Sequence, residues 1–140
     1  MSLTLCIFKP DLADSRINSG QAMLRLLAVD LLPINLVLTR MTMTQAKTLY
    51  KEHEGQPYYG KNIEHVTSGL CMVMIIDAEL AVERLRDLIG ATDPTKARPG
   101  TLRAIYGKGL PNNAVHGSAT EEDAIREINI FFEGVVDATR

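Results

Sequence analysis

The stretch Ser68-Gly69-Leu70-Cys71-Met72-Val73-Met74-Ile75-Ile76-Asp77 is the part of this sequence that decides the fold class. Its residues 70–76 are all apolar, which is typical of a central strand covered on both faces. Leu3 to Lys9 has the pattern of another buried strand, Ile34 to Met43 alternates like a half-buried strand, and Asn113 to His116 can form a last short strand. We therefore expect a four-stranded sheet with residues 68–77 in its interior.

Helical segments alternate with these strands along the chain. The first is expected to begin at a cap on Asp14 or Ser15 and to run to about Val29. Its predicted apolar side comprises Ile17, Met23, Leu24, Leu27 and Ala28. Caps of the later helices are expected at Thr44, at Asp77, and at Ser118 or Thr120. Residues 91–113 are rich in proline and glycine, and this long segment predicts a mostly irregular, functional loop.

The alternation of strands and helices predicts the fold class. The simplest solution is α/β (α+β): a ferredoxin-like βαββαβ sandwich with a four-stranded antiparallel sheet, added helices and one long loop. Because no linker, internal repeat or low-complexity tract interrupts the sequence, a single domain is expected over residues 1–140.

The composition is that of an ordinary globular domain, with 46% apolar and 23% charged residues. A formal net charge of −2 argues against a broad basic face for nucleic acid or anionic lipid. The longest apolar run, Leu70 to Ile76, is too short to cross a membrane, and Met1 to Thr4 carry no basic secretory segment. Cys6 and Cys71 lie in apolar strands and are expected to be buried reduced thiols, so a cytoplasmic location is predicted.

The segment Asn113-Ala114-Val115-His116-Gly117-Ser118 carries the strongest chemical signal. Gly117 leaves one face of the His116 imidazole open, and the N–H groups of the following helix point toward the same place. Glu127 lies on that helix, and a carboxylate bonded to one ring nitrogen would leave the other as a nucleophile. From these residues alone, a structural histidine at a strand end is the simpler interpretation.

Cationic residues elsewhere in the chain favour a functional role for His116 over a purely structural one. Lys9 ends a buried strand and needs an anionic partner. Arg86 lies on a helix, and Arg103 lies in the long loop, directly after residues 98–102; taken singly, each is most simply a solvated charge. Since no glycine-rich phosphate loop of the Walker type is present, side chains and helix ends must handle any phosphate. Together, these cations match the charge of a transferring phosphoryl group.

Several collinear motifs then make the sequence similar to a known family. They are Ile7-Phe8-Lys9-Pro10-Asp11, Pro57-Tyr58-Tyr59, Thr67-Ser68-Gly69, Gly90-Ala91-Thr92-Asp93-Pro94, Arg98-Pro99-Gly100-Thr101-Leu102-Arg103, Asn113-Ala114-Val115-His116-Gly117-Ser118 and Glu127-Ile128. On these motifs the chain resembles the nucleoside diphosphate kinases from Leu3 to about Phe132. The resemblance implies a ferredoxin-like domain and a homo-oligomer, either tetramer or hexamer.

The resemblance also implies a ping-pong reaction. A nucleoside triphosphate such as ATP phosphorylates His116, and a second nucleoside diphosphate collects the phosphate, with Mg²⁺ carried by the nucleotide phosphates and no protein metal site. Glu127 would orient His116, and Ser118 would bond to Glu127. Phosphate or sugar contacts are implied for Lys9, Tyr50, Arg86, Thr92, Arg103 and Asn113. The base would stack between Tyr58 and Leu110, which would explain indifference to base identity.

Two departures from the family pattern keep another interpretation open. Ala119 stands where the family usually has an acid, and Ala104-Ile105 replaces a common Gly-Asp. A nucleotide-binding domain without turnover, or less simply a ferredoxin-like nucleic-acid module, is therefore the alternative. His53 is interpreted as part of a solvated helix end, and His65 as a surface residue or an indirect support of the site.

Overall fold

One antiparallel sheet organises the computed structural model, which describes residues 1–135. The strands are β1 (Ser2–Phe8), β2 (Leu32–Thr39), β3 (Cys71–Ala78) and β4 (Val115–Gly117). Their order across the described sheet is β2-β3-β1-β4, with every neighbouring pair antiparallel. This confirms the predicted four-stranded sheet, although β4 begins two residues later than the sequence indicated.

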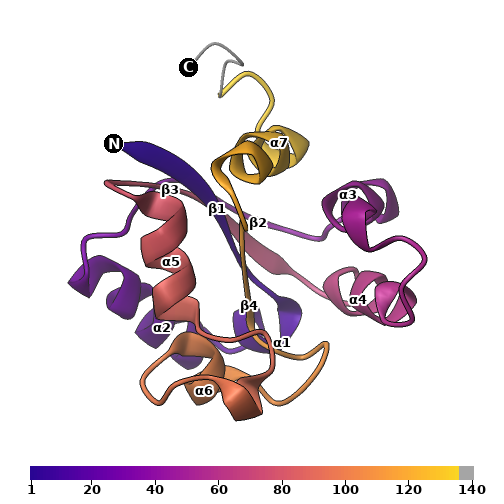
Figure 1. The fold of residues 1–140 in the computed structure, drawn as a ribbon, viewed down its shortest axis with the longest axis horizontal. Coiled ribbons are helices and arrows are strands. Elements are labelled where there is room, and N and C mark those ends of the chain that lie inside the picture. Colours follow the sequence, from indigo (N-terminus) through magenta and orange to yellow (C-terminus); the bar gives the residue numbers. More distant parts are fainter. Residues whose placement is uncertain (136–140) are drawn as a thin grey trace.

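Helices cover both faces of the sheet (Figure 1). One layer contains α2 (Arg16–Ala28) and α5 (Ala81–Ile89), and the other contains α3 (Met43–Leu49), α4 (Tyr59–Val66) and α7 (Glu121–Phe131). Shorter elements are α1 (Pro10–Ala13), α6 (Leu102–Tyr106), η1 (Lys51–His53) and η2 (Pro94–Lys96). In residues 1–135, no helix has both the length and the apolar character that a membrane span requires.

The central position of β3 follows from its apolar run. Successive side chains of a strand point to opposite faces. Met74 and Ile76 therefore pack against the α2/α5 layer, while Val73 and Ile75 pack against the α3/α4/α7 layer. All four side chains are fully buried, as expected for a strand between two helical layers.

Local capping was predicted correctly for two helices. Ser15 accepts a hydrogen bond from the Asn18 N–H at the start of α2, and Thr120 accepts one from the Asp123 N–H at the start of α7. These caps could be read from the sequence because the acceptor and donor are only three residues apart.

Two predicted caps are wrong. Thr42, not Thr44, caps α3, because its hydroxyl accepts the Gln45 N–H while the Gln45 side chain accepts the Thr42 N–H. Asp77 lies inside β3, since pairing with β1 continues to Ala78. The residue before α5 is Leu80, with a positive φ of 51° and no side-chain cap.

The predicted apolar side of α2 is also wrong. The side chains that α2 buries are Ser19, Ala22 and Leu26, with Met23 partly buried beside them. Ile17, Leu24 and Leu27 are instead 73%, 65% and 45% exposed, and Ala28 is exposed too. The helix therefore packs on the sheet through Ser19, Ala22 and Leu26 and turns most of its larger aliphatic side chains outward.

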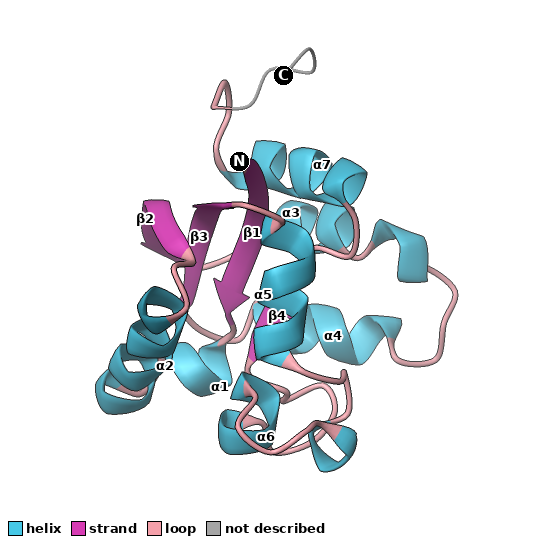
Figure 2. Cartoon of the chain, turned by 60° about the vertical axis from the view of Figure 1, so that its left-hand side comes forward, coloured by secondary structure: helices cyan, strands magenta, loops and turns pink. Residues whose placement is uncertain are grey.

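Strand β2 continues this outward apolar surface at the free edge of the sheet (Figure 2). Leu36 and Leu38 pair with Met74 and Met72, so they point to the sheet face that α2 covers. They are 49% and 52% exposed. We call the surface formed by these exposed side chains the α2–β2 face; its members are Ile17, Leu24, Leu27, Leu36 and Leu38.

Candidate active site

A cavity of about 720 Å³ lies beside the end of β4. Its lining brings together all of the site residues predicted from the sequence except Ser118, which is buried behind it. The predicted residues in the lining are Lys9, Tyr50, Tyr58, Arg86, Thr92, Arg103, Leu110, Asn113, His116 and Glu127. Segments that are far apart in the sequence thus meet in one place.

His116 is held through one of its two ring nitrogens. Its Nε2 lies 2.8 Å from Oε1 of Glu127, and the Ser118 hydroxyl donates to the same oxygen over 2.8 Å. Because a carboxylate accepts, the proton belongs on Nε2, which leaves a lone pair on Nδ1. Within residues 1–135, Nδ1 has no hydrogen-bond partner. The arrangement can therefore present Nδ1 as a nucleophile.

Glycine at position 117 lets β4 carry His116 to the cavity. Strand β4 pairs with β1, placing His116 opposite Ile7. A Cβ on Gly117 would lie 2.7 Å from Cδ1 of Ile89 and 3.3 Å from Cδ2 of Leu85, both on α5. Real Cβ atoms do not come within 2.7 Å of another heavy atom, so a side chain at position 117 would force at least the Ile89 side chain to shift.

Lys9 is a buried cation with neutral partners. Its side chain reaches Oδ1 of Asn113 at 2.7 Å and the Pro111 carbonyl at 3.4 Å, and the residue is 5% exposed. Burial, together with the positive charge of Arg103, lowers the pKa of Lys9 to about 8. The anionic partner that the sequence analysis required is therefore left for a ligand to supply.

Arg103 is anchored next to the histidine by backbone carbonyls. Its Nε and Nη2 donate to the Val115 carbonyl at 3.2 and 2.9 Å, and its Nη1 donates to the Gly90 carbonyl at 3.0 Å. Burial and the nearby charge of Arg86 lower the pKa of Arg103 to about 10, so the guanidinium remains charged at neutral pH. Lys9 and Arg103 thus form a fixed positive wall.

Aromatic side chains line the opposite part of the cavity. The Tyr50 ring stands edge-on to the His116 ring at a centroid distance of 6.3 Å. Burial raises the pKa of Tyr50, and its hydroxyl is buried without a partner among residues 1–135. Tyr58 and Leu110 are 44% and 62% exposed at the cavity rim. They are large apolar groups positioned where a planar ligand could contact them.

Two of the lining residues that were not predicted as site residues contact predicted ones. His53 is exposed at the end of η1, as the sequence predicted, and its Nδ1 also lies 2.9 Å from the Tyr58 hydroxyl. Arg126 was not singled out, although its Nη2 is 3.5 Å from Oε2 of Glu127. The position of Arg126 directly before Glu127 was an available signal. A hydrogen bond between His53 and Tyr58 has no such signal, because it depends on the turn between them.

The two departures from the family pattern, Ala104-Ile105 and Ala119, leave the positive wall of Lys9 and Arg103 in place. Ala104 and Ile105 form part of α6, whose first turn is capped by the Thr101 hydroxyl. The helix carries Arg103 in its first turn and aims it at β4. Ala119 lines the cavity and brings no carboxylate to that wall. The altered loop therefore changes the neighbours of Arg103 without removing its side chain from the site.

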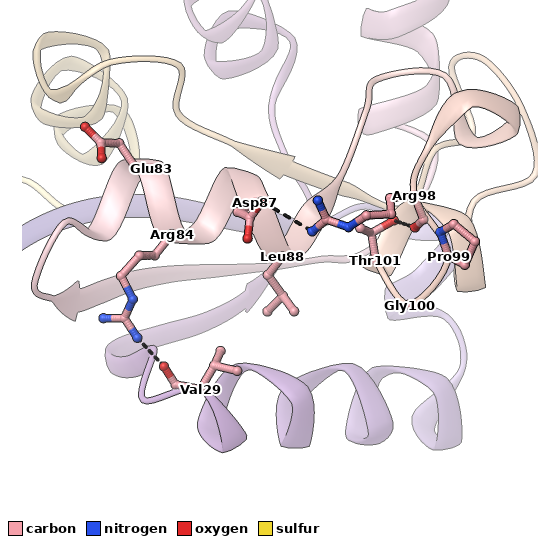
Figure 3. A pocket seen from close by; sticks show the side chains of 9 residues that line it. All are labelled: Val29, Glu83, Arg84, Asp87, Leu88, Arg98, Pro99, Gly100 and Thr101. Carbon is pink, nitrogen blue, oxygen red and sulfur yellow. Dashed lines mark hydrogen bonds and ion pairs between the residues drawn. The ribbon is translucent and has the colours of Figure 1, made fainter.

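A second hollow of about 490 Å³ lies between α5 and the Arg98–Thr101 segment (Figure 3). Three of its four charged side chains already bond within the chain, Arg84 to the Val29 carbonyl and Arg98 to Asp87 at 3.3 Å. The Arg98–Asp87 pair is largely solvent-exposed, and exposed pairs of this kind contribute little. The hollow contains none of the sequence-predicted site residues and is separate from the candidate active site.

A ferredoxin-like sandwich with an oriented histidine beside buried cations defines a phosphate-handling class of protein, and comparisons identify the family. The family model described as "Nucleoside diphosphate kinase" matches residues 2–135. A Psychromonas ingrahamii nucleoside diphosphate kinase is 39% identical over 92% of this chain and 89% of its own length, and a Parafrankia sp. relative of the same name is 40% identical over 94% and 96%. The chain belongs to the nucleoside diphosphate kinase family.

Solved structures agree with that assignment. The Aquifex aeolicus nucleoside diphosphate kinase superposes with a TM-score of 0.89 at 31% identity, covering 95% of this chain and 96% of that one. A halophilic nucleoside diphosphate kinase from Halobacterium salinarum, solved in complex with CDP, has a TM-score of 0.89 at 34% identity, covering 99% and 93%. The ferredoxin-like fold predicted from the sequence is thereby confirmed.

The tautomer of His116 provides a direct test of the site geometry. With Glu127 as acceptor, neutral His116 is expected to carry its proton on Nε2, and ¹⁵N NMR should show an unprotonated Nδ1. In Glu127→Ala the preference should weaken, because the acceptor is gone. The His65 signals serve as an internal reference. A protonated Nδ1 in the unmodified, neutral protein would contradict the geometry.

Proposed function

We propose that this chain is a nucleoside diphosphate kinase that moves the γ-phosphate of ATP or another nucleoside triphosphate to a nucleoside diphosphate through a phosphohistidine at His116. The observation that carries the proposal is the hydrogen bond from Nε2 of His116 to Glu127, which leaves Nδ1 free in a cavity with buried cations. The names of the relatives, and the CDP complex of the Halobacterium salinarum protein, support the substrate class.

The reaction consists of two displacements at one site. In the first, the Nδ1 lone pair of His116 forms a bond to the γ-phosphorus while the bond to the β,γ-bridging oxygen breaks, and the nucleoside diphosphate leaves. Nε2 keeps its proton throughout and donates a hydrogen bond to Glu127. In the second, a terminal oxygen of another nucleoside diphosphate attacks phosphorus and His116 is restored. Holding the reactants in line can contribute about 7–11 kcal/mol.

Lys9, Arg86 and Arg103 are proposed to stabilise the charge on the phosphoryl oxygens. Lys9 and Arg103 are fixed by neutral oxygen acceptors, so their charges are not already neutralised by a carboxylate bond. Fixed donors in a partly desolvated site need little reorganisation when the transition state forms. Arg86 lines the same cavity and is the most exposed of the three.

The remaining cavity residues are proposed to hold the nucleoside. Tyr58 and Leu110 would contact the two faces of the base, and Thr92 and Asn113 would contact the sugar or phosphates. Asn113 is already positioned, since its Nδ2 donates to the Thr92 carbonyl at 2.9 Å. Stacking on an aromatic ring uses the π-face that every base has, which fits a broad choice of bases.

Mg²⁺ is proposed to arrive with the nucleotide phosphates. In residues 1–135, no group of three or more acidic, histidine or cysteine side chains is arranged to hold a metal ion. The cavity carboxylates Glu52 and Asp123 lie 4.0 and 3.6 Å from Arg126, so they already face a cation. This donor set fits an ion bound mainly by phosphate oxygens and water. Mg²⁺ bound there would neutralise charge on the phosphates.

We also propose that the chain works as a single catalytic domain in the cytoplasm. The cavity takes residues from both ends of the sequence, from Lys9 to Glu127, so no smaller piece contains it. Cys6 and Cys71 are both buried and free, in keeping with a reducing compartment.

A labelling experiment tests the function against its alternative, a domain that binds nucleotides without turnover. The protein mixed with γ-labelled ATP and Mg²⁺, without acceptor, should take up acid-labile, alkali-stable label, because phosphohistidine has that stability. The label should pass to added nucleoside diphosphate, and His116→Ala should take up none. Nucleotide binding without label would favour the binding domain, and transfer at the normal rate by His116→Ala would overturn the assignment of the nucleophile.

The lowered pKa of Lys9 predicts proton uptake on binding. With a pKa of about 8 in the free protein, Lys9 is about half charged at pH 8, and a bound phosphate would raise its pKa. ADP binding at pH 8 should therefore take up roughly half a proton, since phosphate with a second pKa of ~6 is already ionised. Affinity should be highest below pH 8 and fall as the pH rises through it.

Calorimetry of ADP binding in buffers with different ionisation enthalpies would measure this uptake. In Lys9→Met the uptake should disappear, and the affinity should depend little on pH between 7.5 and 9. Arg103 offers a useful contrast, because its pKa of about 10 keeps it charged through this range. Equal proton uptake by both proteins would assign the titration to another group.

We further propose that the chain forms a homo-oligomer, a tetramer or hexamer, through the α2–β2 face. Five large aliphatic side chains lie exposed on this face, each at least 45%. Strand β2 also has an unpaired edge in the described sheet. A second copy related by a two-fold axis would present the same aliphatic surface and the same strand edge, which closes a dimer. A further interface would then join such dimers into a tetramer or hexamer.

Light scattering would test this assembly. The wild-type chain should have the mass of several subunits, and Leu24→Glu or Leu38→Glu should reduce it by placing a charge on the buried interface. Leu70→Glu is the matched control, because Leu70 is 48% exposed but lies outside the α2–β2 face. A monomeric wild-type chain, or equal masses for all variants, would contradict the proposal.

A further inference from the structure

A buried histidine–carboxylate pair lies behind the candidate active site. Nε2 of His65 is 2.9 Å from Oδ1 of Asp11, and the side chains are only 12% and 7% exposed. His65 was interpreted from the sequence as surface or indirect support, and its burial removes the first of those options. A carboxylate buried to this degree is costly unless its oxygens are bonded. The role of this pair therefore follows from the groups that the two oxygens of Asp11 bond.

The second oxygen of Asp11 holds the turn that leads to His116. Oδ2 accepts the Ala114 N–H at 2.9 Å, and the Ala114 carbonyl accepts the Lys9 N–H at 2.8 Å. Ala114 has a φ of 74°, which is costly for a residue with a Cβ. Both sides of this strained residue are thus bonded to the Lys9–Asp11 segment. The turn places Asn113, whose amide oxygen holds Lys9 at 2.7 Å. These contacts form the phosphate wall of the cavity.

The first oxygen of Asp11 holds the other wall through α4. His65 lies in the last turn of α4, and Tyr58 is the residue directly before its first turn. An eight-residue helix is about 12 Å long and moves as one rigid rod. The chain just beyond this helix also lies on α1, because a Cβ on Gly69 would be 3.3 Å from Cβ of Pro10. Fixing His65 therefore fixes the end of the rod that carries Tyr58.

We propose that His65 is a positioning residue that ties the base wall, carried by α4, to the phosphate wall, carried by the turn at Ala114, through the single carboxylate of Asp11. This inference rests on the proposed function, because it assigns Tyr58 to the base and Asn113 with Lys9 to the phosphates. His65 touches no reacting atom. Its effect is to keep the two walls at the spacing of one nucleoside diphosphate, so that base and phosphates bind together.

If His65 positions α4, its loss should affect two ligands differently, whereas a general loss of stability should affect them equally. Pyrophosphate needs only the phosphate wall, which Asp11 still holds at Ala114 when His65 is replaced. ADP needs both walls, and loss of base stacking alone lowers affinity by about tenfold. Loss of His65 should therefore weaken ADP much more than pyrophosphate, whereas a general loss of stability would weaken both alike.

The experiment is calorimetric binding of ADP and of pyrophosphate to the full chain and three variants. His65→Phe keeps the ring but removes the donor, His65→Gln restores an N–H near the position of Nε2, and Glu64→Gln is the exposed control on the same helix. Urea unfolding accompanies each variant. If His65→Phe shows no cooperative unfolding, His65→Asn, whose shorter amide falls short of Asp11, takes its place.

We expect the donor-less variant to bind ADP at least tenfold more weakly, with pyrophosphate affinity within about twofold of the wild type. His65→Gln should bind ADP within about threefold of the wild type. An equal loss for both ligands, no loss for either, or failure of His65→Gln to restore ADP binding would overturn the tie. If the wild type takes label from ATP, these results leave the kinase assignment standing; a wild type that neither binds ADP nor takes label would remove both.

Discussion

The buried carboxylate of Glu127 is the interaction on which the rest of the site depends. It is 4% exposed, so its charge must be compensated inside the protein. Ser118 and His116 bond to Oε1, and Arg126 lies near Oε2. Ser118 in turn accepts the Leu5 N–H, which connects α7 to β1 as well as to β4. The three-residue strand β4 is short for independent pairing, and this carboxylate fixes it between the sheet and α7. The same bonds of Glu127 therefore orient the histidine and hold β4 in the fold.

Unlike the carboxylate of Glu127, the cations near His116 are not bonded to a group of opposite charge within residues 1–135. Lys9 and Arg103 are buried or half-buried, and both bond to neutral oxygens. Burial lowers both pKa values because the charged forms lose water without gaining a carboxylate partner. The folded chain thus holds two charges that are more stable in water, a cost of the kind that functional sites retain. Under the proposed function, a polyphosphate would supply the missing countercharge, so that ligand binding would relieve an unfavourable feature of the free fold.

Sequence reasoning recovered those features whose causes are local or patterned. The apolar run of β3 has one interpretation, and the caps at Ser15 and Thr120 need only a neighbour three residues away. The candidate site residues were identified from the family motifs, because their contacts could not be predicted from the sequence. The apolar side of α2 was assigned wrongly, since aliphatic residues at helical spacing mark a buried face without saying whether this sheet or another surface buries it. The His65–Asp11 pair spans 54 residues and has no sequence pattern at all.

Charges in the cavity divide into two sets with different consequences. Arg126 lies among Glu52, Asp123 and Glu127, so its charge is largely matched by carboxylates and contributes little net attraction for an anion. Lys9 and Arg103 have no such match, and Ala119 adds no acid beside them. Lys9 and Arg103 thus place fixed positive charge close to His116, while the exposed Arg86 and Lys61 line the same cavity. Under the proposed function, the phosphates would lie at this end of the cavity, which would leave the nucleoside at the Tyr58 rim.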